Sequence, residues 1–389
     1  MRGVWLLAVR HAVHNRVATV VLVLCIGVVM FLPWAAEMVV SRFQSELTSR
    51  AAHVPLVAGA KGSKFDLALS TMFFRESELA TIPMSELREI QGWRMGVAVG
   101  VSTRFTAHGW PLVGVGREYF ERQGLEPSEG TLPLVMGDVV LGSDAAEALG
   151  LGAGDVLFSD QRELYDIAKP PALKMRVCGV LAPMGTPDDM AAFVDLKTTW
   201  LLEGIAHGHV EATSVDRAMV IGEAEGQVVL SPALIEANEV TSDNLASFHM
   251  HADDSGLPLT SILFYPEDER AATIIKARVN RSDAYQMVSA TGVMDELLAY
   301  VFRVKALLDS LSVVLGACTV VLTGLVVTLS LRLRARELEA LHRIGCSRFT
   351  TVRLVGAELG VILLASAGLA AAGVLVAGAI VGNAIWVIG

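Results

Sequence analysis

The chain has 389 residues and a formal net charge of −10; 53% of its residues are hydrophobic and 19% are charged. A soluble domain carries about 25% charged residues, so the composition argues against a purely soluble protein. The acidic balance also argues against a nucleic-acid binder, because such proteins use Lys and Arg to neutralise phosphates.

The first 40 residues predict a surface helix followed by a membrane span. Residues 1–16 place apolar beside basic side chains, as does an amphipathic helix on the inner membrane surface. Residues 17–40 are almost uncharged until Glu37 and are long enough to cross a hydrocarbon core of about 30 Å. A cleaved signal peptide is the alternative, but its apolar region normally holds about 7–15 residues, and residues 34–37 make a poor cleavage site. We therefore expect an uncleaved anchor.

Residues 41–306 predict one large or two small extracytoplasmic domains of the α/β (α+β) class, inserted after the first span. Ser143 is the expected N-cap of a helix that Gly150 stops. Cys178 is the one cysteine of this region, so no disulfide framework is available, and we expect it to be a small core residue. Short β-branched runs predict strands at residues 94–105, 110–115, 138–141, 175–181, 191–194, 218–221 and 260–265, and helical patterns lie at 143–149, 195–202 and 267–279.

Two histidine pairs form the metal-binding candidate of this region. Imidazoles two positions apart, with carboxylates nearby, suit a zinc- or copper-like ion if the two segments meet. The alternative is that they are solvated residues of polar loops. The four candidate ligands are His207, His209, His249 and His251.

Two further apolar stretches predict spans after the domain. Residues 307–331 form the second, and residues 354–389 form a third that is too long to cross the bilayer without tilting. One long tilted helix is favoured over a hairpin of two short helices, because no turn signal interrupts the stretch and two spans need about 40 residues. Small residues there suit close helix packing in lipid, namely Gly360, Gly368, Gly373 and Gly378.

The segment between these spans, residues 332–353, is short and rich in arginine, as is the N-terminal segment. Both should be cytoplasmic by the positive-inside rule, which places the acidic residues 41–306 and the C-terminus outside. Leu338, Leu341, Ile344 and Val352 give the segment an apolar stripe, and Gly345 and Ser347 supply a helix stop and a cap. It therefore reads as a helix-turn-helix at the inner surface.

Ionisable residues near the spans have structural interpretations. Glu358, at the start of the third span, is expected to pair with Arg353 or Arg348, with a role in relaying nucleotide state as the alternative. Glu37 and Asp309 are expected at the outer membrane surface.

The sequence holds no motif of a catalytic centre. A phosphate-binding loop requires G-x-x-x-x-G-K-[ST], and residues 59–63 resemble it only superficially. No G-x-S-x-G, H-E-x-x-H or Cys-x-x-Cys motif occurs either. The chain is therefore not expected to be an enzyme or to bind a cofactor of its own.

Several segments resemble the FtsX-like ABC transporter permeases, the membrane subunits of lipoprotein-release and macrolide-exporter type systems of the mechanotransmission class. The resemblance covers nearly the whole chain and is carried by PLVAGAKGSKFDLALSTMFF at 55–74, VVLGSDAAEALGLGAGD at 139–155, VCGVLAPMGTPDDMAAFV at 177–194 and RARELEALHRIGCSRFTTVRLVGAE at 334–358.

The resemblance implies a multi-pass protein of the plasma (inner) membrane whose energy comes from a separate ABC ATPase that holds ATP and Mg²⁺. It implies a homodimer, or a heterodimer with a related permease, in contact with membrane lipids and with an extracytoplasmic protein partner. It also implies that the arginine-rich segment docks on the ATPase, whereas electrostatic anchoring to anionic lipid is the alternative. The residues carried over to that coupling role are Arg336, Glu339, Leu341, Arg343, Ile344, Gly345, Ser347, Arg348 and Glu358.

One feature departs from the family, which has one span before the domain and three after it. Only two are found after it here, so the fourth is either truncated or absent in this branch. The expected function is a permease subunit that couples ATP hydrolysis to movement of the outer domain, for export or substrate release. The alternatives are a regulatory membrane protein that controls an envelope enzyme, and a metal-sensing receptor.

Overall fold

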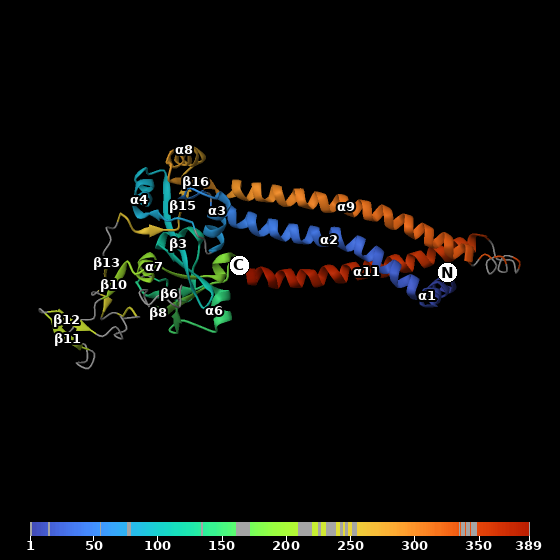
Figure 1. The fold of residues 1–389 in the computed structure, drawn as a ribbon, viewed down its shortest axis with the longest axis horizontal. Helices are drawn as coiled ribbons and strands as arrows, with labels where there is room; N and C mark the ends of the chain where they lie inside the picture. Colours follow the sequence, from blue (N-terminus) through green and yellow to red (C-terminus); the bar gives the residue numbers. More distant parts are fainter. Residues whose placement is uncertain are drawn as a thin grey trace. The chain divides into compact units, whose positions relative to one another are not determined.

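The computed structural model comprises two compact units, one made of Met1–Leu47 with Glu296–Gly389 and the other of Thr48–Asp295 (Figure 1). We call them the helical unit and the sheet domain. The structure describes residues 2–14, 16–54, 56–75, 79–133, 135–160, 172–208, 220–224, 227–230, 239–241, 244–245, 248–250, 255–333, 335, 339, 343 and 348–388.

The helical unit contains α1 (Arg2–His14), most of α2 (Arg16–His53), most of α9 (Ala290–Leu333) and α11 (Arg348–Ile388). Within the described residues, three segments are long and apolar enough to cross a membrane, Thr19–Ser45, Ala290–Leu329 and Val352–Ala379. α11 is one uninterrupted helix rather than a hairpin of two. At about 1.5 Å per residue, α2 and α9 are each about twice as long as the hydrocarbon core is thick.

Glycines bring α2 and α11 into close contact. A Cβ atom on Gly373 would lie 3.0 Å from the Phe31 ring, and one on Gly378 would lie 3.0 Å from the Met38 sulfur. The Gly378 carbonyl also accepts a hydrogen bond of 3.2 Å from the Arg42 guanidinium. The packing role expected from the small residues of α11 is therefore confirmed at these two positions, whereas a Cβ atom on Gly368 would meet no described atom within 4 Å.

The sheet domain is built on a ten-stranded mixed sheet in the order β16-β1-β15-β3-β4-β9-β6-β8-β5, with β7 pairing β8. Its strands are β1 (Leu56–Ala60), β3 (Gly96–Ala107), β4 (Trp110–Val115), β5 (Pro127–Gly130), β6 (Asp138–Leu141), β7 (Val156–Phe158), β8 (Lys174–Leu181), β9 (Ala192–Asp195), β15 (Ser261–Pro266) and β16 (Tyr285–Ser289).

Two-stranded pairs and short helices complete the domain. The pairs are β2 (Ile82–Pro83) with β14 (Pro258–Leu259), β10 (Ala206–Gly208) with β13 (Phe248–Met250), and β11 (Val220–Ala224) with β12 (Gln227–Leu230). The helices are α3 (Lys64–Phe73), α4 (Met84–Gly92), α5 (Arg117–Gln123), α6 (Ser143–Leu149), the 3₁₀ helix η1 (Pro187–Met190), α7 (Leu196–Leu202) and α8 (Glu269–Val279).

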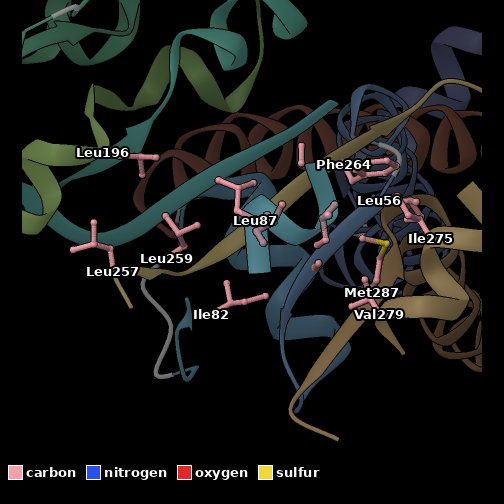
Figure 2. Packing of buried hydrophobic residues seen from close by; sticks show 14 of the residues in the cluster. Leu56, Ile82, Leu87, Leu196, Leu257, Leu259, Phe264, Ile275, Val279 and Met287 are labelled. Atoms are coloured by element: carbon pink, nitrogen blue, oxygen red, sulfur yellow. The ribbon is translucent and has the colours of Figure 1, made fainter. Parts of the chain in front are cut away.

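Two hydrophobic clusters stabilise the domain. The first joins β1, β15 and β16 to α4 and α8, and Figure 2 shows Phe264, Leu87 and Ile275 among its members. The second joins β6, β8 and β9 to α6 and α7 and includes Val139 and Val194. The sheet domain thus contains two cores. The structure confirms the predicted combination of a mixed α/β domain with long apolar helices.

Two local predictions were wrong. Ser143 is the first residue of α6, and its N-cap is Gly142, where a Cβ atom would lie 2.3 Å from the Asp188 carbonyl oxygen. Only glycine fits a backbone approach this close. Gly150 does end α6 in the left-handed conformation, with φ 66°.

Cys178 is not a core residue. Along β8 the buried positions are Met175, Val177, Gly179 and Leu181, so Cys178 lies half-buried on the other face. Its thiol donates a 3.2 Å hydrogen bond to the Thr131 carbonyl. Burial raises the pKa of this thiol to about 12, which keeps it protonated and poorly nucleophilic at neutral pH.

Candidate functional site

The last turn of α2 carries a buried arginine in the sheet domain. Residues from Thr48 onward belong to that unit, and Arg50 is 3% exposed. Its guanidinium meets three elements: the Met72 carbonyl of α3, the Tyr119 hydroxyl and Gln123 amide oxygen of α5, and the Asp188 carboxylate of η1. We call these five residues the Arg50 joint.

Every N–H group of Arg50 has an acceptor. Nε donates to the Met72 carbonyl (3.1 Å), Nη1 to Gln123 Oε1 (3.4 Å) and to Asp188 Oδ2, and Nη2 to Tyr119 Oη (2.9 Å) and Asp188 Oδ1 (3.2 Å). A guanidinium has five N–H donors in a rigid fork, so its hydrogen-bonding capacity is used completely. The end of α2 is therefore fixed in one orientation within the domain.

The acceptor side of the joint is equally complete. Asp188 is 1% exposed and accepts two bonds from Arg50, one from the Tyr119 hydroxyl and one of 2.8 Å from the Thr186 hydroxyl. Thr186 and Asp189 form a capping box around η1, which holds the Asp188 backbone in place. The Asp188 carboxylate is thus held by its own short helix as well as by the arginine.

Aromatic rings shield the Arg50 joint from water. The Arg50 guanidinium lies 5.5 Å from the Phe74 ring centroid, and Phe193 of β9 packs at 5.6–5.7 Å from Phe74, Tyr119 and Phe120. Burial raises the pKa of Tyr119 well above its usual value, so its hydroxyl remains a donor to Asp188. Burial acts to lower the pKa of Arg50, but the neighbouring Tyr119 and Asp188 outweigh that effect and raise it.

A second ionic cluster lies within the helical unit. Lys305 of α9 is 3.0 Å from the carboxylates of both Glu37 on α2 and Asp309 on α9. A lysine flanked by two carboxylates neutralises charge that would be costly near hydrocarbon. Glu37 and Asp309 were expected only at the membrane surface, and the structure shows that both form an ion pair with Lys305.

The residues expected to contact an ATPase lie largely outside the described residues. This holds for Arg336, Leu341, Ile344, Gly345 and Ser347. Of the remainder, Arg343 Nη2 lies 2.7 Å from Glu339 Oε1 in an exposed i,i+4 pair, Arg348 begins α11, and Glu358 is half-buried on α11. The Arg353 guanidinium lies 4.5 Å from the Phe349 ring centroid. The coupling role and the pairing of Glu358 with an arginine remain predictions.

The predicted histidine segments meet in the structure. β10 and β13 are antiparallel, and their register places His207 directly opposite His249. His209 and His251 lie outside the described residues.

Sequence reasoning missed the Arg50 joint. One signal was present: Leu47, Ala51 and Val54 form an apolar stripe at helical spacing, and Arg50 lies within it. The second was Thr186-Pro-Asp-Asp189, the pattern of a capped helix start.

Comparison with known proteins does not place the chain in a family. No family model and no curated protein matches it. Among solved structures it is similar to the extracellular domain of the noncanonic ABC-type transporter YknZ from Gram-positive bacteria, at 11% identity and a TM-score of 0.32. The match covers 60% of this chain and 98% of that one.

Proposed function

We propose that the chain is the membrane subunit of an ABC-type complex, in which a separate ATPase subunit drives conformational change of the sheet domain for export or substrate release. The observation that carries the proposal is the Arg50 joint. It fixes, inside a folded domain, the end of a helix whose preceding Thr19–Ser45 segment is long and apolar enough to cross a membrane. A helix that only anchored a domain would not need an end held by five directional bonds.

The chain connections support the same mechanism. α2 ends at His53 and β1 begins at Leu56, while β16 ends at Ser289 and α9 begins at Ala290. β1 and β16 are antiparallel neighbours at one edge of the ten-stranded sheet. Two membrane-length helices therefore connect directly to two adjacent strands, so a relative shift of the helices acts on one strand pair.

The energy source is proposed from the sequence. The chain has no phosphate-binding loop motif, so ATP would be hydrolysed by a partner. The arginine-rich segment between α9 and α11 is the proposed contact with that ATPase on the cytoplasmic side. Two permease copies, or this chain with a related one, would match the closed twofold symmetry common in such assemblies.

Co-purification tests the proposal. The tagged full chain, extracted from membranes with detergent, is expected to carry an ABC ATPase in stoichiometric amount, and Arg343→Glu or Gly345→Pro is expected to remove it. Arg117→Glu, a change at an exposed arginine of α5, is the matched control and should retain it. Recovery of the wild-type chain without any ATPase would reject the ABC assignment. Equal recovery with both loop variants would reject the loop as the contact.

Thiol labelling of sealed cells tests the orientation. Cys346 should be protected from a membrane-impermeant reagent, whereas a cysteine placed at exposed Arg117 should react. The reverse pattern would overturn the proposed threading.

A further inference from the structure

β16 is an edge strand of the described sheet, with β1 as its neighbour on one side. An edge strand is a risk to a protein, because its outward N–H and C=O groups can pair with a strand of another chain. β16 reads Tyr-Gln-Met-Val-Ser, without proline or charge. Met287 and Val288 are buried, and Met287 packs in the first hydrophobic cluster, near Val279 of α8 in Figure 2. β16 therefore has the properties that favour strand addition.

The register shows which backbone groups of β16 point away from β1. The Lys61 N–H donates a 2.8 Å hydrogen bond to the Ala284 carbonyl, so the backbone groups of Ala284 face the β1 side. In an antiparallel pair, residues that bond the neighbouring strand alternate with residues that do not. Every second residue from Ala284 therefore faces β1, and Tyr285, Met287 and Ser289 present their N–H and C=O groups to the open side.

The side-chain amide of Asn280, the C-cap residue of α8, occupies this open side at its centre. Asn280 Oδ1 accepts a 3.1 Å hydrogen bond from the Met287 N–H, and Asn280 Nδ2 donates one of 2.9 Å to the Met287 carbonyl. A residue of a neighbouring strand would make the same pair of bonds. Nδ2 also donates to the Lys276 carbonyl at 2.8 Å, which fixes the amide against the last turn of α8.

Both ends of the open side are also engaged locally. The Tyr285 N–H donates to the Ser282 hydroxyl at 3.3 Å. Ser289 is directly followed by α9, and its hydroxyl accepts a 3.3 Å bond from the Gly292 N–H, which is the bonding pattern of a helix N-cap. Met287 is therefore the central position at which a further strand would have to pair, and Asn280 closes it.

The opposite edge of the sheet is protected by other means. β5 begins at Pro127, carries Glu129 and has a bulge in its pairing with β8 between these two residues. Proline, charge and bulges are common protections of an edge strand. β16 has none of the three, and its pairing with β1 is regular over five residues. The side chain of Asn280 takes their place.

We propose that Asn280 is a plug that closes the β16 edge against pairing with a second copy of this chain. Two copies of β16 paired about a twofold axis at Met287 would place Tyr285 opposite Ser289 and bring no like charges together. Asn280 is itself exposed and holds the position that the second strand would take. Because β16 leads directly into α9, such pairing would tie the domain end of a membrane-length helix to another molecule. The plug keeps this end free, and its action does not depend on an ATPase.

Hydrogen exchange of the full chain in detergent, read at single residues by mass spectrometry, tests the bonds to Met287. The Met287 amide should exchange about tenfold or more faster in Asn280→Ala than in the wild-type chain, because the variant opens it to water. Asp268→Ala is the matched control. It removes the cap at the other end of α8, a 2.6 Å bond from the Ala271 N–H, and should leave the Met287 amide nearly unchanged.

Two results of this experiment would overturn the plug. One is equal exchange of the Met287 amide in the wild-type chain and in Asn280→Ala. The other is exchange in the wild-type chain as fast as in a free peptide of the same sequence, a comparison that does not depend on the folding of any variant.

A labelled peptide of residues 283–291 tests whether the edge is closed, and it does so whether or not the chain is already a dimer. Fluorescence anisotropy should show saturable binding of the peptide to Asn280→Ala, and no binding to the wild-type chain or to Asp268→Ala. The same peptide with Met287→Pro lacks the central N–H and should not bind. Equal anisotropy with the wild-type chain and with Asn280→Ala, or equal binding of the proline peptide, would overturn the proposal.

Discussion

Removal of the Arg50 guanidinium is the sharpest test of the joint. Arg50→Met keeps the apolar stem but deletes five hydrogen bonds, and it leaves the Asp188 carboxylate, 1% exposed, with only the Tyr119 and Thr186 hydroxyls as donors. Breaking a buried ion pair from one side costs about 3–5 kcal/mol because the remaining charge stays buried.

The size of the effect can be measured locally. A tenfold change in an equilibrium corresponds to about 1.4 kcal/mol. A loss of about 3–5 kcal/mol therefore raises the population of locally unfolded forms around Arg50 and Asp188 about 100-fold to several-thousand-fold. Hydrogen exchange with mass spectrometry on the full chain in detergent would read it in the peptides of α5 and η1.

Two variants serve as controls for this test. Arg117→Met removes an exposed pair with Glu121, at 3.0 Å, and should cost about 0.2–1 kcal/mol. The double variant Arg50→Met/Asp188→Leu removes both charges and should recover much of the loss, since an apolar pair of similar volume is often neutral. If Arg50→Met cost no more than Arg117→Met, the guanidinium would not be buried and bonded as described.

Three further predictions concern single positions. Burial raises the pKa of the Cys178 thiol to about 12. The alkylation rate of this thiol in the folded chain should therefore rise about tenfold per pH unit from pH 8 to about 12, because only the thiolate reacts. A rate that levels off near pH 9 would contradict the burial. Gly373→Val should destabilise the α2–α11 contact by about 1–3 kcal/mol in thermal unfolding, whereas Gly368→Val should not; equal effects would rule out glycine-mediated packing. Gly142→Ala should lower the melting temperature of the sheet domain strongly, whereas Gly152→Ala, which meets only the Glu129 carboxylate at 3.8 Å, should change it little; a silent Gly142→Ala would disprove the close backbone approach.

Hydropathy and turn chemistry predicted part of the fold. The strand at 138–141 and the helix at 143–149 appear with the expected bounds because a β-branched run is followed by a short helix that a glycine ends. The apolar segments predicted three long helices, but not that α2 continues through the polar residues 41–53. Tertiary contacts of a narrow apolar stripe (Leu47, Ala51 and Val54) and of Arg50 hold that extension.

Local sequence patterns did not predict β1, a strand whose residues are constrained by the helix packed against it. β1 reads Leu-Val-Ala-Gly-Ala, a poor strand pattern, yet all five residues are buried. A Cβ atom on Gly59 would lie 2.4 Å from a terminal methyl of the buried Leu67 side chain of α3, so a larger residue there would force Leu67 to shift. Such a constraint comes from a contact that no local pattern encodes.

The candidate sites were predictable to different degrees. The histidine spacing was visible in the sequence, but the opposition of His207 and His249 depends on a strand register that the long intervening segment hides. Arg50 could be suspected from its apolar stripe, but its partner Asp188 lies far along the chain. Sequence thus shows which groups are unusual, and only the fold shows which ones meet.

If α2 transmits movement to the sheet domain, as the proposed function requires, an arginine suits the end of that helix better than an apolar residue would. Apolar contacts are non-directional and roughly proportional to buried area, so a helix can slide along an apolar seam while each lost contact is replaced by the next. The guanidinium of Arg50 has acceptors on α3, α5 and η1 at fixed angles, and a shift of one residue leaves a charge buried without them. A buried ion pair often adds little net stability over an apolar core, yet separating its partners is costly because a charge then stays buried without its partner. Movement of α2 would therefore displace the three attached elements together instead of slipping past them.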